Sequence, residues 1–245
     1  MRRCLLCLLL MLIMCFCHAQ DTTTHAGPET VARTNKPSEN ILEKFSVLKA
    51  DKKIRQGLFQ SFYNENKLVA SGRYNNGKKI GIWRYSNFNG IINQVYDYTN
   101  NKLLFTIMPD TSFARFEFDT KINDADSLTY PVKIGGNFYG YWFFLSSHIG
   151  QLALDMRNDA DDFMRAKRYS EVMKGYRCIH VLTVGIDGIL ARWQLLVTGK
   201  DFKELYEIKL DKVSEDNKLF IPATQNGKPV ASKVYIQTQA AFLAW

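Results

Sequence analysis

The chain has 245 residues, of which 46% are hydrophobic and 13% aromatic, and 32 Lys and Arg against 24 Asp and Glu give it a formal net charge of +8. The basic residues are scattered and no run of five occurs, which argues against a nucleic-acid partner. A mild basic excess of this kind favours contact with anionic surfaces over contact with acidic proteins.

The first nineteen residues predict a secretory signal peptide. Arg2 and Arg3 precede an unbroken apolar run of 14 residues, Cys4–Cys17, whereas a membrane-spanning helix needs about 20. We therefore expect cleavage near Ala19–Gln20, export to the periplasm or outer envelope, and no stable membrane span. Removal of this segment leaves 30 basic against 24 acidic residues, a net charge of +6.

Cysteine usage is consistent with a chain that has no internal disulfide. Four of the five cysteines lie in the predicted signal peptide, which leaves Cys178 alone in the mature protein. Cys178 is flanked by apolar residues, and free cysteine is among the most buried residue types. We expect a core residue, with a reactive thiol as the alternative.

Residues 20–40 are rich in Thr, Pro and charge, and they predict a disordered leader. Residues 41–110 differ, because short aromatic or β-branched runs alternate there with Asn, Gly and Lys turns. A shift of 24 residues places 57–59 (Gly-Leu-Phe) on 81–83 (Gly-Ile-Trp) and Tyr74 on Tyr98. This offset indicates an internal repeat of about one β-hairpin.

The stretch RYNNGKKIGIW at 73–83 has two possible readings. A phosphate-binding loop needs a Gly-Lys-Ser/Thr ending and a following helix, but here a Trp-containing strand follows. Asn76 and Gly77 tolerate the positive φ angles of a tight hairpin turn, so we predict a turn with the lysines at its tip.

The longer stretch GRYNNGKKIGIWRYSNFNGII resembles the bacterial variant of the MORN-type repeat, with Gly-x-Tyr and Asn-Gly-Lys-x-x-Gly-x-Trp on successive hairpins. The resemblance covers residues 57–104 and two copies, the second degenerate. It implies an elongated single-layer sheet with a binding or spacing role, and it names no ligand.

Residues 111–245 predict a second unit. After Gly135-Gly136, aromatic residues at helical spacing predict a helix over 137–148, and its aromatic stripe serves either core packing or ligand stacking. Residues 158–173 predict another helix, with a calcium loop as an alternative that lacks the required Gly and Glu. A hairpin around Asp187-Gly188 follows, then an amphipathic helix over 199–213 and a closing strand, Val230–Thr238.

We therefore expect an α+β C-terminal module, strand-strand-helix-strand with preceding helices, after an N-terminal antiparallel β-hairpin repeat sheet. The module, roughly residues 130–242, resembles the C-terminal domain of TonB-type envelope proteins. The resemblance rests on Gly135-Gly136, on Ile186-Asp187-Gly188 and on the string Pro-Ala-x-x-Asn-Gly-Lys-Pro-Val at 222–230. It implies a small sheet whose edge captures an extended peptide from an envelope protein.

The strand expected to form that edge carries the predicted partner-binding residues. Energy transduction is not expected, because the chain has a short cleavable signal and only six prolines instead of an anchor and a proline-rich spacer. The predicted residues are Val230, Ser232, Val234, Tyr235, Ile236 and Thr238.

Catalytic motifs are missing from the sequence. It has neither a His-x-x-x-His nor a mature Cys-x-x-Cys pair for zinc, and no Gly-x-Ser-x-Gly nucleophile pattern. Cys178 and His180 lie two apart on a predicted strand, where we expect them in the core. We predict a non-enzymatic protein without cofactor or metal. The alternatives are a structural or surface-tethering protein that binds glycan or lipid through the aromatic hairpin sheet, and a hydrolase.

Overall fold

The computed structural model describes residues 27–108, 114–143, 145, 177–199 and 203–239. The predicted signal peptide, the first part of the leader and the helix predicted over 158–173 lie outside these residues. The described part of the chain is mostly antiparallel β-sheet, and its helical elements are all short.

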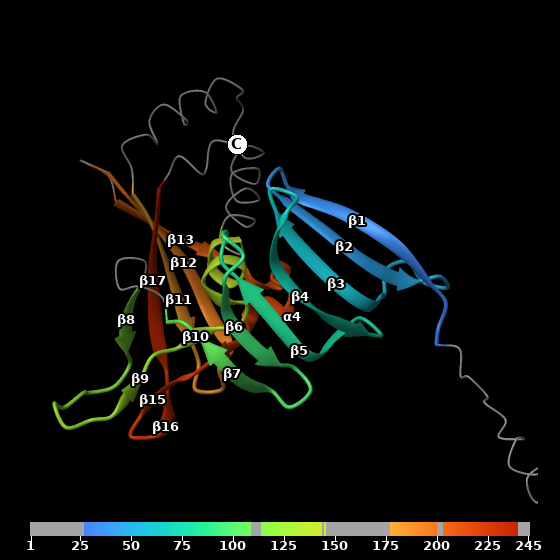
Figure 1. Cartoon of the computed structure of the whole chain (residues 1–245). Coiled ribbons are helices and arrows are strands. Elements are labelled where there is room, and N and C mark those ends of the chain that lie inside the picture. Colours follow the sequence, from blue (N-terminus) through green and yellow to red (C-terminus); the bar gives the residue numbers. More distant parts are fainter. Residues whose placement is uncertain (1–26, 109–113, 144, 146–176, 200–202, 240–245) are drawn as a thin grey trace, which may run out of the picture.

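The first sheet is a meander of seven antiparallel strands that follow one another in chain order (Figure 1). Each strand pairs with its neighbours in sequence, as expected for consecutive hairpins. Its strands are β1 (Thr30–Ser38), β2 (Ile41–Leu48), β3 (Arg55–Tyr63), β4 (Lys67–Asn75), β5 (Lys78–Ser86), β6 (Ile92–Asp97) and β7 (Lys102–Thr106).

The predicted tight turn at Asn76-Gly77 is confirmed. Asn76 has a φ of 49° and Gly77 a φ of 80°, the left-handed values that a two-residue hairpin requires. The turn at Asn226-Gly227 repeats this geometry, with φ angles of 52° and 75°. Asn101, which stands where the second repeat lacks a glycine, also has a positive φ of 48°.

The expected disorder of residues 20–40 is wrong for Thr30–Ser38, which forms β1. This strand pairs with β2 from Thr30 opposite Leu48 to Asn35 opposite Glu43. Nearly all of its side chains are exposed. The main-chain hydrogen bonds to β2 need no apolar side chains, which is why a polar sequence forms a strand here.

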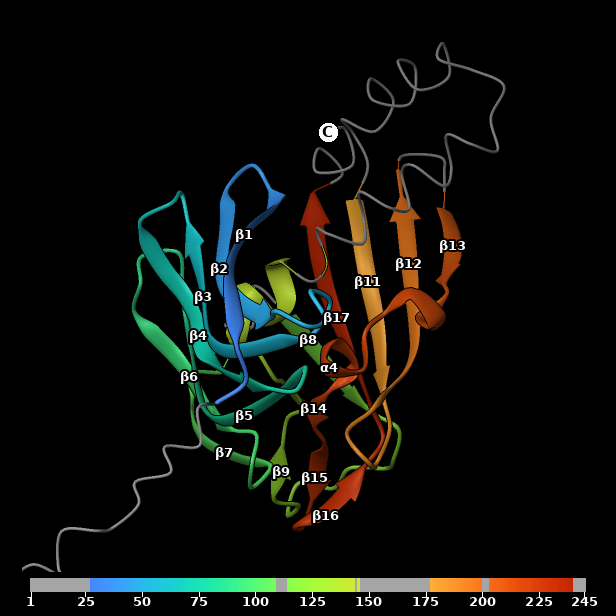
Figure 2. The same cartoon turned by 90° about the vertical axis from the view of Figure 1, so that its right-hand side faces the viewer.

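The second sheet has five strands in the order β13-β12-β11-β17-β8, and Figure 2 shows it beside the first sheet. Two small sheets, β10 with β14 and β9 with β15 and β16, complete the fold. The strands are β8 (Ala114–Phe118), β9 (Leu128–Thr129), β10 (Val132–Lys133), β11 (Arg177–Val184), β12 (Leu190–Thr198), β13 (Lys203–Ile208), β14 (Phe220–Ile221), β15 (Ala223–Gln225), β16 (Lys228–Val230) and β17 (Ser232–Gln239).

The predicted α+β module is therefore wrong, because the structure is dominated by antiparallel sheet. Within the residues predicted as an amphipathic helix over 199–213, the chain forms strand β13. Tyr206 and Ile208 lie opposite Leu195 and Trp193 of β12, so alternation, and not helical spacing, places these side chains. Among the residues of this range that the structure describes, only the three-residue 3₁₀ helix η3, Leu210–Lys212, is helical.

The helix predicted over 137–148 corresponds to the π-helix η1, Gly136–Phe143. Of its aromatic stripe, Phe138 and Tyr141 are buried, and so is Leu145. The core-packing reading therefore holds for these three residues. A further short helix among the described residues is α4, the four-residue segment Glu215–Lys218.

Two hydrophobic clusters hold the sheets together. The first fills the inner face of the second sheet around Trp193, Leu182 and Ile236. The second lies on the first sheet around Trp83 and Tyr85 and is covered by Ile134, with Tyr139, Leu219 and Ile221 packed against it. The segment around η1 and β14 thus joins the two sheets.

Gln94 of β6 fixes the start of η1. Its buried Oε1 accepts hydrogen bonds from the backbone N–H groups of Gly135 (2.7 Å) and Gly136 (3.0 Å), and its Nε2 donates to the carbonyl of Lys133 (3.0 Å). One side chain therefore satisfies three buried backbone groups where the chain enters η1.

Candidate functional site

The predicted partner-binding strand is not an edge. β17 pairs with β11 on one side, from Ser232 to Gln239, and with β8 on the other, from Ser232 to Ile236. Ser232, Val234 and Ile236 are buried in the sheet's inner face. Tyr235 packs under Arg115 of β8, whose guanidinium carbon lies 4.1 Å from the ring centroid.

Strand addition at β17 is therefore excluded along Ser232–Ile236. Val230 lies outside β17, where it ends β16 opposite Ala223. Thr238 continues the pairing with β11, opposite Cys178. The sequence indicated a strand at the right place, but not that β8, more than a hundred residues earlier, would cover its other side.

The aromatic rings around Trp83 are buried and do not form an open binding platform. Trp83 and Tyr85 have exposed fractions of 0%. Phe59 stacks on Trp83 at a centroid distance of 5.4 Å, and Tyr74 meets the same indole edge-on at 5.2 Å. These four rings are therefore not available for ligand stacking, and the glycan or lipid alternative would have to use other side chains of the sheet.

A polar network lies on the same inner face. Glu43, which is 5% exposed, accepts hydrogen bonds from Arg55 (3.1 Å) and from the hydroxyl of Tyr139 (3.3 Å). Arg55 also donates to the hydroxyl of Tyr74 (3.1 Å). Burial lowers the pKa of Arg55, but Tyr74 and Glu43 together raise it above its ordinary value. Because its charges are paired, this network stabilises the contact between the sheet and η1.

Lys133 is a buried cation at the junction of the two sheets. Its Nζ donates to the carbonyl of Leu219 (3.2 Å) and lies 4.9 Å from the ring centroid of Phe220. Burial and, to a smaller extent, the neighbouring Lys79 lower the pKa of Lys133 to about 7, while Asp216 opposes this shift.

This pKa predicts that the protein becomes more stable between pH 7 and pH 9. The folded state loses the Lys133 proton near pH 7, whereas an unfolded lysine keeps it to about 10.4, so the unfolded state binds more protons in between. We expect the free energy of unfolding to rise by about 2 kcal/mol from pH 7 to 9. Denaturant titrations at both pH values measure this free energy. In Lys133→Met it should change little between pH 7 and pH 9. A rise that survives in this variant would assign the effect to another group.

His180 and Cys178 point into the second sheet's core, as the strand alternation predicted. Both have exposed fractions of 0%. The indole N–H of Trp193 donates to Nδ1 of His180 (3.1 Å), while Nε2 of His180 has no hydrogen-bond partner. Burial raises the pKa of Cys178 to about 11 and lowers that of His180 to about 3. The thiol is therefore protonated and the imidazole neutral at pH 7.

The two edges of the first sheet differ in chemistry. β1 carries Lys36 and Pro37, and its pairing with β2 is irregular between Asn35 and Ser38, three features that hinder the docking of another strand. In the described part of the chain, β7 pairs only with β6. It has no proline, although its register shifts at Leu104.

Strand β7 and its surroundings are strongly apolar and exposed. Leu104 is 48% exposed and Phe105 46%. At the end of β7 they are joined by further exposed side chains from the same strand's continuation and from the β5–β6 hairpin. These are Phe88, Ile91, Ile92, Ile107 and Met108. Several exposed apolar side chains near one edge of a sheet indicate a candidate interaction site.

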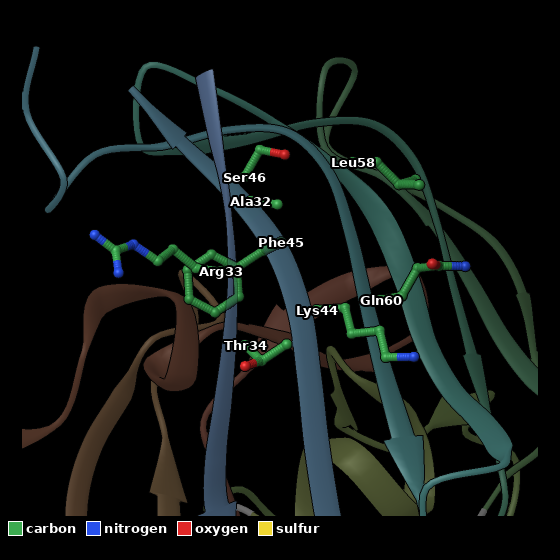
Figure 3. A pocket seen from close by; sticks show the side chains of 8 residues that line it. All are labelled: Ala32, Arg33, Thr34, Lys44, Phe45, Ser46, Leu58 and Gln60. Carbon is green, nitrogen blue, oxygen red and sulfur yellow. The ribbon is translucent and has the colours of Figure 1, made fainter. Parts of the chain in front are cut away.

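The outer face of the first sheet contains a shallow hollow of about 370 Å³ over β1, β2 and β3. In Figure 3, Lys44, Gln60 and Leu58 point to one side of the sheet. Arg33 and Phe45 point to the opposite side, so they contribute backbone to its floor. The remaining lining residues are Ala32, Thr34 and Ser46.

Sequence reasoning did not single out these outer residues or the residues of β7. The alternation of side chains along each predicted strand places these residues on one face of the sheet. The functional predictions considered only the aromatic residues. That β7 ends the sheet depends on the chain's next strand, β8, joining the second sheet.

Comparisons with known family models, with curated proteins and with solved structures find no match. Among the described residues, no helix is both long and apolar enough to span a membrane. Within the same residues, no cluster of three or more His, Cys, Asp or Glu side chains is arranged to hold a metal ion.

Proposed function

We propose that the chain is an exported, non-enzymatic binding protein that captures an extended peptide from an envelope protein by adding a strand to β7. The observation that carries this proposal is an edge strand whose apolar side chains, Leu104 and Phe105, are about half exposed. The predicted signal peptide supports export. Strand addition, which the sequence predicted for Val230–Thr238, is now proposed for β7.

Strand addition suits the chemistry of β7. An edge strand presents main-chain N–H and C=O groups that an added strand satisfies, and alternate side chains then give specificity. Leu104, Phe105 and the neighbouring Ile107 favour a peptide with apolar side chains. The other edge, β1, with Lys36 and Pro37, is poorly suited to the same role.

A selected peptide provides the test. Peptides that bind the mature chain are selected from a random displayed library, and hydrogen exchange is measured with the synthetic peptide bound. We expect exchange to slow at least ten-fold at those amides of residues 102–106 that point away from β6. Two N-methylated forms of the peptide should behave differently. Methylation of the alternate residues whose N–H groups face β7 should abolish binding, and methylation of the intervening residues should preserve it.

Side-chain variants complete the experiment. Phe105→Lys should weaken the peptide at least ten-fold, whereas Ile80→Lys, which adds the same charge at an exposed position in the middle of the sheet, should change affinity less than two-fold. Protection outside β7, or equal binding by both N-methylated peptides, would contradict strand addition at this edge.

A further inference from the structure

A row of polar side chains crosses the outer face of the first sheet at right angles to its strands. Lys44 of β2 lies directly opposite Gln60 of β3, Gln60 opposite Ser71 of β4, and Ser71 opposite Arg84 of β5. On the other side of Lys44 the row continues to Thr34 of β1. Directly opposite residues project from the same face of a sheet, so these five side chains form one polar row.

Apolar side chains border the polar row on both sides. On one side, Phe62 lies opposite Leu42 and Leu68. On the other side Leu58, which is 51% exposed, lies opposite Arg73. The hollow of about 370 Å³ lies at the Lys44 end of the row.

This face is cationic, although Glu65, which pairs with Lys36, is close enough to Lys44 to interact with it electrostatically. Lys44, Arg73 and Arg84 are exposed, and none of them forms an ion pair with a described acid. Lys44 packs above the ring of Phe62, with Nζ 5.1 Å from the centroid. The carboxylate of Asp97 near Arg84 is held by the turn amides of Thr99 and Asn100.

From this arrangement we propose that the polar row binds an acidic polysaccharide laid across the strands. Lys44 and Arg84 are three strand spacings apart, about 14 Å, which suits carboxylates on separate sugar units of one chain. Gln60, Ser71 and Thr34 offer amide and hydroxyl groups to sugar hydroxyls between and beside them. The bordering Leu58 and Phe62 contact the C–H faces of sugar rings.

The row lies on the same face as the edge strand, because beyond Arg84 it continues to Val95 of β6 and Phe105 of β7. A peptide added to β7 runs parallel to the strands and uses main-chain groups, whereas the row runs across them and uses side chains. A lipid surface is the less favoured partner, because the cations Lys44 and Arg84 are spread along a line and are not gathered in one patch. We therefore make vesicles one arm of the test.

Oligogalacturonic acid, a linear chain of uronic acids, is a suitable probe for calorimetric titration of the mature protein. We expect affinity to rise with chain length until the oligomer spans Lys44 and Arg84. The methyl-esterified oligomer, which has the same length without the charge, should bind at least ten-fold more weakly. Poly-glutamate and phosphatidylglycerol vesicles should not compete at equal charge concentration.

Charge-removing variants locate the site. Lys44→Gln and Arg84→Gln should each weaken the oligomer at least five-fold, and the double variant at least twenty-fold. Lys78→Gln removes the same charge at an exposed residue of the β4–β5 turn, outside the row, and should change affinity less than two-fold.

Three outcomes would overturn the proposal: absence of binding, an equal loss in Lys78→Gln, or displacement by poly-glutamate or vesicles. The β7-binding peptide should be unaffected by Lys44→Gln, at the far end of the row from β7. Phe105→Ser, which adds no charge to the row, should weaken the peptide and leave the oligomer bound. Failure of one site is therefore distinguishable from failure of the other.

Discussion

Replacing Trp83 by alanine should lower the free energy of unfolding by about 4 kcal/mol, the range for removing a large aromatic side chain from a core. Trp83 is fully buried and has ring contacts with Phe59, Tyr74 and Tyr98. Its indole N–H donates to the carbonyl of Arg73 (3.2 Å). Chemical denaturation, with the exposed Leu58→Ala as control, measures the difference.

Gly72 packs against the indole of Trp83 and provides a second test of this packing. A Cβ on Gly72 would lie 2.2 Å from Trp83 Cδ2, so Gly72→Ala should also destabilise the protein strongly, by about 2 kcal/mol or more. In the Trp83→Ala background the added methyl has space, and its cost should nearly vanish. Two additive losses would mean that the indole does not pack on Gly72.

Acidification should destabilise the protein through His180. The pKa of His180 is lowered to about 3 by burial, whereas an unfolded histidine titrates near 6.5, so the unfolded state takes up the proton first. The stability that depends on neutral His180 is complete above pH 6.5 and is lost as the pH falls toward 3. We expect a loss of about 3 kcal/mol between pH 6.5 and pH 4.

The variant His180→Gln isolates this contribution. Glutamine keeps an acceptor for the indole N–H of Trp193 but cannot titrate. Exposed carboxylates such as Asp97 and Glu207, whose pKa values are lowered by hydrogen bonds, contribute equally in both proteins. The difference in denaturation midpoint between pH 7 and pH 4 should therefore be smaller in the variant. Equal acid sensitivity would show that His180 is not the titrating group.

Local turn chemistry made the hairpins predictable. Asn76-Gly77 and Asn226-Gly227 adopt the left-handed geometry expected from their residue types, and the β11–β12 hairpin around Gly188 forms as expected. Such features depend on a few neighbouring residues, so a single sequence contains the information.

The errors arose where distant partners decide the structure. The segment that forms β13 has a pattern compatible with helix or strand, and pairing with β12 selects the strand. β17 was expected to be open because nothing in Val230–Thr238 indicates that β8 pairs with it. For the same reason the edge position of β7 and the polar row through Lys44 and Gln60 emerged only from the register of the strands.

The pairing of β8 with β17 has a consequence for synthesis. Phe118 lies opposite Ser232, so the second sheet closes only after β17, more than a hundred residues beyond β8, has left the ribosome. The seven-stranded meander joins only neighbours in sequence and can form hairpin by hairpin as it emerges. Contacts between sequence-distant strands form slowly, so a protein shortened before β17 should leave β8 and β11 without their shared partner while the meander is complete.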